Sequence, residues 1–315
     1  MQPLVSIVTP SYNQAQYIEA SLRSVLEQDY PRIEYLVADG GSTDGSVEII
    51  RRYAGRLAWW VSEKDSGQAE AINKGFARAS GEIVAWLNSD DLYLPGAVSA
   101  AVRAFEQHPQ AGLVFGDVVS INAAGEAINV MTCGDWGLDD LLQFKIISQP
   151  GVFLRRAALE QAGYLDLKMH YMLDHQLWLR VAQHTPMQYV PERWAAARFH
   201  ENAKNINQAA GFAREAYQLV DWIQTQPGLQ EPYRRLNKRI RAGAHRINGF
   251  YLLDAGQPRA ALAAYLKSLA LHPSLALPEW RRILYAAASL VGNPAALRKA
   301  YLNKRQEKLA RGEKR

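Results

Sequence analysis

The sequence holds a single cysteine, Cys133, among its 315 residues. One cysteine cannot form a disulfide within the chain or build a cysteine-based zinc site, so both classes are excluded. We therefore interpret this thiol as a small packing residue. A chain with so little cysteine fits a reducing compartment, where disulfides are rare.

Long apolar runs are also missing. The longest candidate, Ile283 to Val291, is far shorter than the roughly 18 apolar residues that cross a bilayer. The N-terminus lacks a basic start followed by a long apolar run, because Leu4 to Val8 ends at once in Thr9-Pro10, which is typical of a strand running into a turn. We expect a cytoplasmic protein without an export signal or a membrane span.

Outside the C-terminus the chain has no excess of positive charge. The net charge is +5, but residues 298–315 hold eight Lys/Arg and two Asp/Glu, while the rest holds 28 Lys/Arg and 29 Asp/Glu. The high pI thus reflects a tail, and we expect no nucleic-acid partner. Leu297, Tyr301 and Leu302 share a helical face in this region, which predicts peripheral, reversible binding of an anionic membrane surface. The alternative is a solvated terminus.

The first part of the chain alternates between strand-like and helix-like patterns. Short apolar runs predict strands at residues 5–9, 33–38, 57–62, 83–87 and 112–119. Periodic patterns predict helices at residues 15–28, 46–53, 68–79 and 95–107. This alternation predicts an α/β fold with a Rossmann-like, mainly parallel sheet.

Strand patterns stop at about Asn207, and helix patterns continue to the end of the chain. They are interrupted at Pro227-Gly228, Gly256-Gln257-Pro258, His272-Pro273 and Gly292-Asn293-Pro294. We therefore expect an α/β domain over residues 1–206 and an α-helical C-terminal region over residues 207–315.

Polar residues follow the predicted strands, and in a parallel sheet ligands bind at the carboxyl ends of the strands. The clusters are Ser11-Tyr12-Asn13, Asp39, Glu63 to Gly67, and Ser89-Asp90-Asp91. Two adjacent carboxylates repel each other and lose solvation unless a cation lies beside them. A divalent cation shared with a substrate diphosphate is a common arrangement. The alternative for Asp90-Asp91 is a turn or helix cap before Pro95.

Asp39 also ends an apolar strand, and the glycines after it allow a ligand to approach the backbone closely. The alternative is an Asx-turn that only reverses the chain. The first strand is followed by neither a Gly-x-Gly-x-x-Gly fingerprint nor a Walker phosphate loop, which disfavours ordinary dinucleotide and ATP sites.

Seven segments together resemble family 2 glycosyltransferases, in order and spacing. They are VSIVTPSYN (5–13), VADGGSTDG (37–45), SEKDSGQAEAINKG (62–75), AWLNSDDLYLP (85–95), SQPGVFLRRAALEQAGYLD (148–166), YMLDHQLWLRVA (171–182) and ARFHENAKN (197–205). The resemblance covers about residues 3–206. It implies a GT-A nucleotide-diphospho-sugar transferase fold, a UDP-, GDP- or dTDP-sugar donor, a divalent cation (Mn²⁺ or Mg²⁺), and inversion at the anomeric carbon.

The resemblance also implies a role for individual residues. Pro10, Tyr12 and Asp39 would line the nucleoside pocket, and Asp65 and Asn73 the donor pocket. Asp90 would bind the ribose region or the metal, and Asp91 the metal. Asp174 would be the catalytic base, which the acceptor hydroxyl needs because it is a poor nucleophile at neutral pH. The alternative for Asp174 is a helix N-cap.

His200 would be a further metal ligand or, with Lys204, would assist the departing diphosphate; the alternative for His200 is a structural histidine. The chain departs from the family at several positions. Gly40, Asn88 and Gln176 stand where Asp is frequent, and Ala203 stands where Ser is common. The nucleotide base is therefore left open. Trp59, Trp60 and Trp178 are expected in the core, while Trp86 and Trp136 would pack or stack on a sugar ring.

Three functions remain open at this point. The first is inverting sugar transfer to a hydroxyl of a glycan or lipid-linked acceptor, in assembly of a surface polysaccharide or lipopolysaccharide. The second is a polyprenyl-phosphate sugar synthase on the same fold, which the missing membrane span disfavours. The third is a non-catalytic nucleotide-sugar-binding scaffold with a helical tail that binds a partner.

Overall fold

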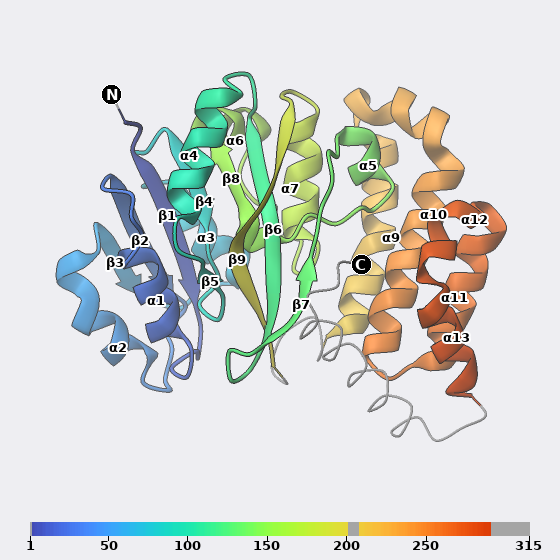
Figure 1. Cartoon of the computed structure of the whole chain (residues 1–315), viewed down its shortest axis with the longest axis horizontal. Coiled ribbons are helices and arrows are strands. Elements are labelled where there is room, and N and C mark those ends of the chain that lie inside the picture. The colour runs from blue at the N-terminus through green and yellow to red at the C-terminus, as the bar shows by residue number, and fades with distance from the viewer. Residues whose placement is uncertain (1, 201–207, 291–315) are drawn as a thin grey trace. The chain divides into compact units, whose positions relative to one another are not determined.

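The computed structural model describes residues 2–200 and 208–290, and the chain divides into two compact units (Figure 1). The first unit comprises Met1–Ile121, Val130–Gly137 and Ile147–Arg198. The second comprises Asn122–Asn129, Leu138–Ile146 and Phe199–Arg315.

Four parallel strands confirm the predicted first half of the sheet. They are β1 (Val5–Ser11), β2 (Ile33–Asp39), β3 (Trp59–Ser62) and β4 (Ile83–Trp86), in the order β3-β2-β1-β4. Ser11 pairs with Asp39, and Asp39 pairs with Ser62, so three strands end at the same level. The polar segments that follow these strands therefore begin at one edge of the sheet.

The sheet continues in the order β8-β6-β9-β5 (Figure 1). These strands are β8 (Val152–Arg155), β6 (Leu113–Asn122), β9 (Met187–Phe199) and β5 (Leu92–Tyr93), and β7 (Ala127–Met131) pairs with β6. β8 is antiparallel to both β4 and β6, so β6 runs in the same direction as β4. The strand predicted at 112–119 is thus oriented as expected, with β8 inserted beside it.

Helices cover both faces of the sheet. They are α1 (Ile18–Leu26), α2 (Ser46–Tyr53), α3 (Gln68–Phe76), α4 (Ala97–Gln107), α6 (Arg156–Ala162) and α7 (Leu173–Ala182), with the 3-10 turns η1 (Ala54–Arg56) and η2 (Gln149–Gly151). Ile18, Leu22 and Val25, the predicted apolar face of α1, are fully buried. The α1 helix begins at Ile18 instead of Ala15, because residues 14–17 form a turn.

Alternate residues of β4 face opposite layers of the first unit. Ile83 and Ala85 belong to the core that α1 and α4 cover. Trp86 points to the other layer, where its ring stacks on Trp178 of α7 with a centroid distance of 5.2 Å. Trp178 is therefore a core residue as predicted, and Trp86 is 1% exposed, so it does not stack on a sugar.

The edge strand β3 carries the two remaining tryptophans of the predicted core. Trp59 and Trp60 are half-buried, so the prediction of a core position holds only in part. The guanidinium of Arg78 lies 4.2 Å from the centroid of the Trp59 ring and covers it from outside.

The second unit contains the expected helical region. Its helices are α5 (Leu138–Leu142), α9 (Ala209–Thr225), α10 (Gln230–Asp254), α11 (Pro258–Leu271), α12 (Pro273–Ala276) and α13 (Trp280–Ala288), with the 3-10 turns η3 (Pro227–Leu229) and η4 (Leu277–Glu279). The breaks predicted at Pro227, Gly256 and Pro273 separate these helices. The break at Gly292-Asn293-Pro294 lies outside the described residues.

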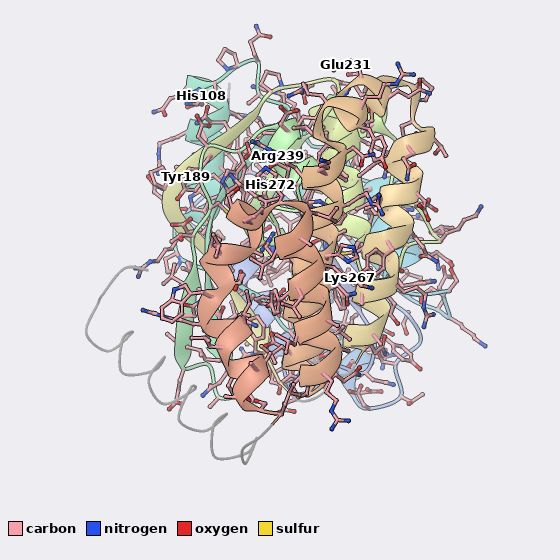
Figure 2. The ribbon with its side chains drawn as sticks, turned by 90° about the vertical axis from the view of Figure 1, so that its right-hand side faces the viewer. His108, Tyr189, Glu231, Arg239, Lys267 and His272 are labelled. Carbon is pink, nitrogen blue, oxygen red and sulfur yellow. The ribbon has the colours of Figure 1, made fainter. Side chains whose placement is uncertain are left out.

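Close contacts along α10 hold the second unit together. Tyr265 of α11 packs on Gly249, where an added Cβ would meet the ring at 3.0 Å. The guanidinium of Arg235 binds both carboxylate oxygens of Asp139, at 2.7 and 2.8 Å. Figure 2 shows the face of this unit where Arg239 Nε donates to His272 Nε2 at 3.2 Å. Among the described residues, no helix is long and apolar enough to cross a membrane.

Candidate active site

The Asp39 carboxylate organises the loop after β2. It is 1% exposed, and Oδ2 accepts hydrogen bonds from the backbone N–H of Gly41 and Ser42, at 3.1 and 2.9 Å, and from Ser62 Oγ at 2.7 Å. Oδ1 accepts from Ser42 Oγ at 2.5 Å. The Asx-turn considered as an alternative is therefore present, and it lies where β1, β2 and β3 end together.

The loop after β1 is fastened to this turn. Asn13 has a left-handed backbone with φ of 52°. Its N–H donates to Ser42 Oγ at 2.8 Å, and its Oδ1 accepts from Thr43 N–H at 2.9 Å. Tyr12, predicted to line the nucleoside pocket, stands beside it with 63% of its surface exposed. An aromatic ring is thus held in solvent next to the Asp39 turn. Pro10 lies within β1 and is buried.

Asp65 approaches the same turn from the loop after β3. A Cβ added to Gly40 would lie 2.8 Å from Asp65 Oδ2, so this carboxylate lies directly against the backbone of the turn. Asp65 Oδ1 accepts from Gly67 N–H at 2.9 Å. Burial, with smaller contributions from the charges of Glu70 and Asp39, raises the pKa of Asp65. The structure therefore brings two of the predicted donor-site carboxylates together.

Asp91 lies at the end of β4 and is 6% exposed. Its Oδ1 accepts from the backbone N–H of Arg198 at 2.9 Å, and its Oδ2 accepts from Asn88 Nδ2 at 3.2 Å. Arg198 Nε also donates to the carbonyl of Asp90 at 3.0 Å. Burial and the adjacent Asp90 charge raise the pKa of Asp91 well above its usual value. The predicted pair is thus braced by β9, a contribution that the sequence did not reveal.

These two carboxylates fit a divalent cation. Each oxygen of Asp91 receives one hydrogen bond, from the Arg198 N–H or from Asn88, and retains a further lone pair. A cation beside Asp90 and Asp91 would offset their mutual repulsion and the loss of solvation that raises the pKa. Within the described ranges, no group of three or more His, Cys, Asp or Glu side chains is placed to hold a metal. The fit therefore rests on the aspartate pair together with oxygens from a substrate.

His200 is 8% exposed and is grouped with the second unit. Its role as a metal ligand stays a prediction. Lys204 and Ala203 lie outside the described residues.

Both polar atoms of the Asn73 side chain, on α3, form hydrogen bonds within the protein. Its Nδ2 donates to the carbonyl of Leu165 at 2.9 Å, and its Oδ1 accepts from the Leu165 N–H at 3.0 Å. The side chain thus ties α3 to the segment that precedes α7.

Asp174 lies in the first turn of α7 and is half-buried. Its Oδ1 accepts from the N–H of His175 at 2.7 Å. The N-cap of α7 is Met172, so the alternative interpretation of Asp174 as the N-cap is wrong. The stack of Trp178 on Trp86 fixes α7 against β4, the strand that leads to Asp90 and Asp91. The helix with the proposed base is therefore anchored directly on the strand of the aspartate pair.

Comparison with known families and proteins identifies relatives of this chain. The family described as "Glycosyl transferase family 2" matches residues 6–145. The putative teichuronic acid biosynthesis glycosyltransferase TuaG of Bacillus subtilis is 45% identical over 93 residues, which are 29% of this chain and 37% of that protein. A PGL/p-HBAD biosynthesis glycosyltransferase of Mycobacterium bovis is 30% identical over 182 residues, or 56% of this chain and 69% of the relative.

Solved structures share the fold. Residues 1–349 of S. aureus TarS in complex with UDP-GlcNAc match with a TM-score of 0.60 and 17% identity, covering 96% of this chain and 92% of that one. The mannosyltransferase PcManGT of Pyrobaculum calidifontis, in complex with GDP-Man and Mn²⁺, matches with a TM-score of 0.58 and 24% identity, covering 100% and 89%. The expected GT-A architecture with a helical C-terminal region is therefore confirmed.

Proposed function

Because the chain belongs to glycosyl transferase family 2, we propose that it transfers a sugar from a nucleotide-diphospho-sugar to a hydroxyl of a glycan or lipid-linked acceptor, with inversion. The observation that carries the proposal is the meeting of Asp39, Asp65 and the Asp90-Asp91 pair at the carboxyl ends of four parallel strands. In such sheets this edge is the ligand site. Residues 1–206 would form the catalytic domain, and residues 207–315 a helical region added to it.

The donor would lie across the loops after β1 to β4. The exposed Tyr12 ring, Pro10 and Asp39 would contact the nucleoside. Asp65 and Asn73 would line the pocket for the sugar, with Asn73 acting through its bond to Leu165. UDP-sugars, GDP-sugars and dTDP-sugars all remain candidates, and the structural relatives include complexes with UDP-GlcNAc and with GDP-Man.

Asp91, with Asp90, would hold a divalent cation, either Mn²⁺ or Mg²⁺, and His200 is the further metal ligand that the sequence predicts. A bound cation would offset the charge of the departing nucleoside diphosphate. Support comes from the buried, hydrogen-bonded Asp91 carboxylate and from the Mn²⁺ named in the complex of the Pyrobaculum calidifontis mannosyltransferase.

Asp174 would take the proton of the acceptor hydroxyl as that hydroxyl attacks the anomeric carbon, opposite the departing diphosphate. Its place in the first turn of α7, with the helix fixed on β4, gives the carboxylate a defined position. The relatives are named for the biosynthesis of teichuronic acid and of PGL/p-HBAD, which supports a role in assembly of a cell-surface polysaccharide or lipopolysaccharide.

Peripheral attachment to an anionic membrane is the proposed location. Within the second unit Leu277, Trp280 and Leu284 are 56%, 51% and 59% exposed, at helical spacing. The guanidinium of Arg281 lies 5.2 Å from the centroid of the Trp280 ring. Exposed tryptophan and leucine beside arginine are suited to a lipid interface. The basic segment 298–315, which was predicted to bind the same surface, lies outside the described residues.

Calorimetry tests the donor site directly. UDP and GDP are titrated with Mn²⁺ into the wild-type protein and into Asp91→Asn, which should bind far more weakly because the cation loses its main protein ligand. Asp29→Asn is the matched control: this exposed aspartate contacts Ser99 near the start of α4 and should not affect binding. Equal affinity in a folded Asp91→Asn protein would sink the assignment.

Activity assays distinguish the proposed function from its two alternatives. Slow donor hydrolysis by the purified protein, abolished by chelation, would exclude a non-catalytic scaffold. Transfer to a polyprenyl phosphate, with no transfer to a hydroxyl acceptor, would favour the polyprenyl-phosphate sugar synthase.

A further inference from the structure

A chain of three side-chain amides joins separate parts of the site. Gln68 Nε2, at the start of α3, donates to Asn88 Oδ1 at 2.7 Å. Asn88 Nδ2 donates both to Asp91 Oδ2 and to Gln149 Oε1, each at 3.2 Å. Gln149 Nε2 ends the chain by donating to the carbonyl of Trp86 at 2.8 Å. Segments up to 81 positions apart, from residue 68 to residue 149, thus converge on one carboxylate.

The direction of this chain is determined at its Gln149 end. Gln149 is 9% exposed, and its nitrogen is committed to a backbone carbonyl, so its oxygen must face Asn88. Asn88 must therefore present its nitrogen to Gln149 and Asp91, and its oxygen to Gln68. An amide can do this, whereas an ionised carboxylate has only acceptors and would set oxygen against two oxygens. This accounts for asparagine at a position where aspartate is frequent in the family.

Two hydrogen bonds orient the Asp91 carboxylate. Asn88 holds Oδ2, and the Arg198 N–H holds Oδ1. The same chain reaches the donor loop, because Gln68 directly follows Gly67, whose N–H is bound by Asp65. The position of Asp91 and the position of the Asp65 loop are therefore linked through a single side chain.

We propose that Asn88 is a positioning residue of the donor site: it orients the Asp91 carboxylate toward a divalent cation and couples this carboxylate, through Gln68, to the loop that carries Asp65. The inference rests on the proposed function. It assigns a role to a residue that does not itself bind the cation. Partners of this kind in the outer shell of a metal site typically contribute about 10- to 100-fold to metal affinity or activity.

The test measures Mn²⁺ binding by electron paramagnetic resonance, and binding of UDP or GDP with Mn²⁺ by calorimetry. Asn88→Leu keeps the branched shape but removes both donors, and should weaken both affinities about 10- to 100-fold. Gln68→Leu should weaken them less. Because Gln68 acts through Asn88, the double variant should be no weaker than Asn88→Leu alone, which is a non-additive result.

Gln28→Leu is the matched control for a merely structural amide. Gln28 also makes three hydrogen bonds, to Ser24, Leu94 and Val98, all to the backbone and none at the donor site. It should lower the unfolding temperature without changing either affinity. If Asn88→Leu does not fold, Gln68→Leu carries the test alone.

Wild-type affinity in a folded Asn88→Leu protein, or additive effects of the two substitutions, would overturn the proposal. If the wild type binds Mn²⁺ but no nucleoside diphosphate, the proposed function fails, and the effect of Asn88→Leu on Mn²⁺ alone still decides the positioning role. No Mn²⁺ binding by the wild type overturns both.

Discussion

The structural role of Asp39 in its turn can be separated experimentally from its proposed role in nucleoside binding. Two substitutions, Asp39→Leu and Asp39→Asn, should affect stability and binding to different extents. The wild-type carboxylate accepts four hydrogen bonds, two from backbone N–H groups and two from hydroxyls. In Asp39→Leu the N–H groups of Gly41 and Ser42 lose their acceptor. A buried donor without a partner costs about 1–3 kcal/mol, and Gly41 and Ser42 are half-buried, so the free energy of unfolding should fall by up to about 6 kcal/mol.

Asp39→Asn should be much milder. The amide oxygen can replace Oδ2 and accept from Gly41, Ser42 and Ser62, while the amide nitrogen donates to Ser42 Oγ, which can accept. All four contacts then survive without the assistance of a full charge, and the free energy of unfolding should fall by only about 1–3 kcal/mol. Urea unfolding followed by circular dichroism measures the free energy of unfolding of the wild type and of both variants, and thus tests whether Asp39→Leu is the less stable variant.

Calorimetry of UDP and GDP then separates the two roles of Asp39. If the carboxylate also contacts the nucleoside, the folded Asp39→Asn protein should bind at least about tenfold more weakly, since one charge-assisted hydrogen bond is worth about 1.5–3 kcal/mol. Wild-type affinity in this variant would refute the nucleoside contact and leave only the Asx-turn. Equal stability of the Leu and Asn variants would refute the stabilising role assigned to the four hydrogen bonds of the Asp39 turn.

Three further predictions concern the base, a buried acid and the membrane. Asp174→Asn should keep donor affinity but lower turnover about 100-fold or more, the usual scale for a lost general base; near-normal transfer would return Asp174 to a structural role. Burial raises the pKa of Asp65, so the folded state keeps this proton to a higher pH than the unfolded state does, and stability should fall as pH rises above about 4 and through the pKa of the folded state. In Asp65→Asn the free energy of unfolding, measured with urea, should depend less on pH. An unchanged pH dependence would contradict the raised pKa of Asp65. The full chain should co-sediment with anionic vesicles at low salt more strongly than a chain truncated after Pro294, and salt should weaken the binding; equal binding would exclude the tail as the anchor.

The parallel half of the sheet could be predicted because its signals are local. Each of the strands β1 to β4 is a short apolar run followed by polar residues, and the position of Asp39 and Asp91 at strand ends follows from that pattern alone. The insertion of β8 between β4 and β6 could not be predicted, because its pairing depends on contacts between residues far apart in the sequence.

The partners of the site residues were hidden for the same reason. Arg198 braces Asp91 from 107 positions away, and Gln149 meets Asn88 from 61 positions away. Nothing in the local sequence marks either contact. The departure of Asn88 from the family pattern was the one available signal, and its meaning required the orientation of the neighbouring amides.

The β3 edge of the sheet bears on how this protein avoids pairing with other chains. At one end of the sheet order lies β3, which is four residues long. A long free strand edge would offer rows of unpaired N–H and C=O groups to another chain, whereas short edge strands and a nearby cation discourage such pairing. Arg78, whose guanidinium lies over Trp59 on β3, places a charge at this edge. Addition of a foreign strand to β3 is thereby disfavoured.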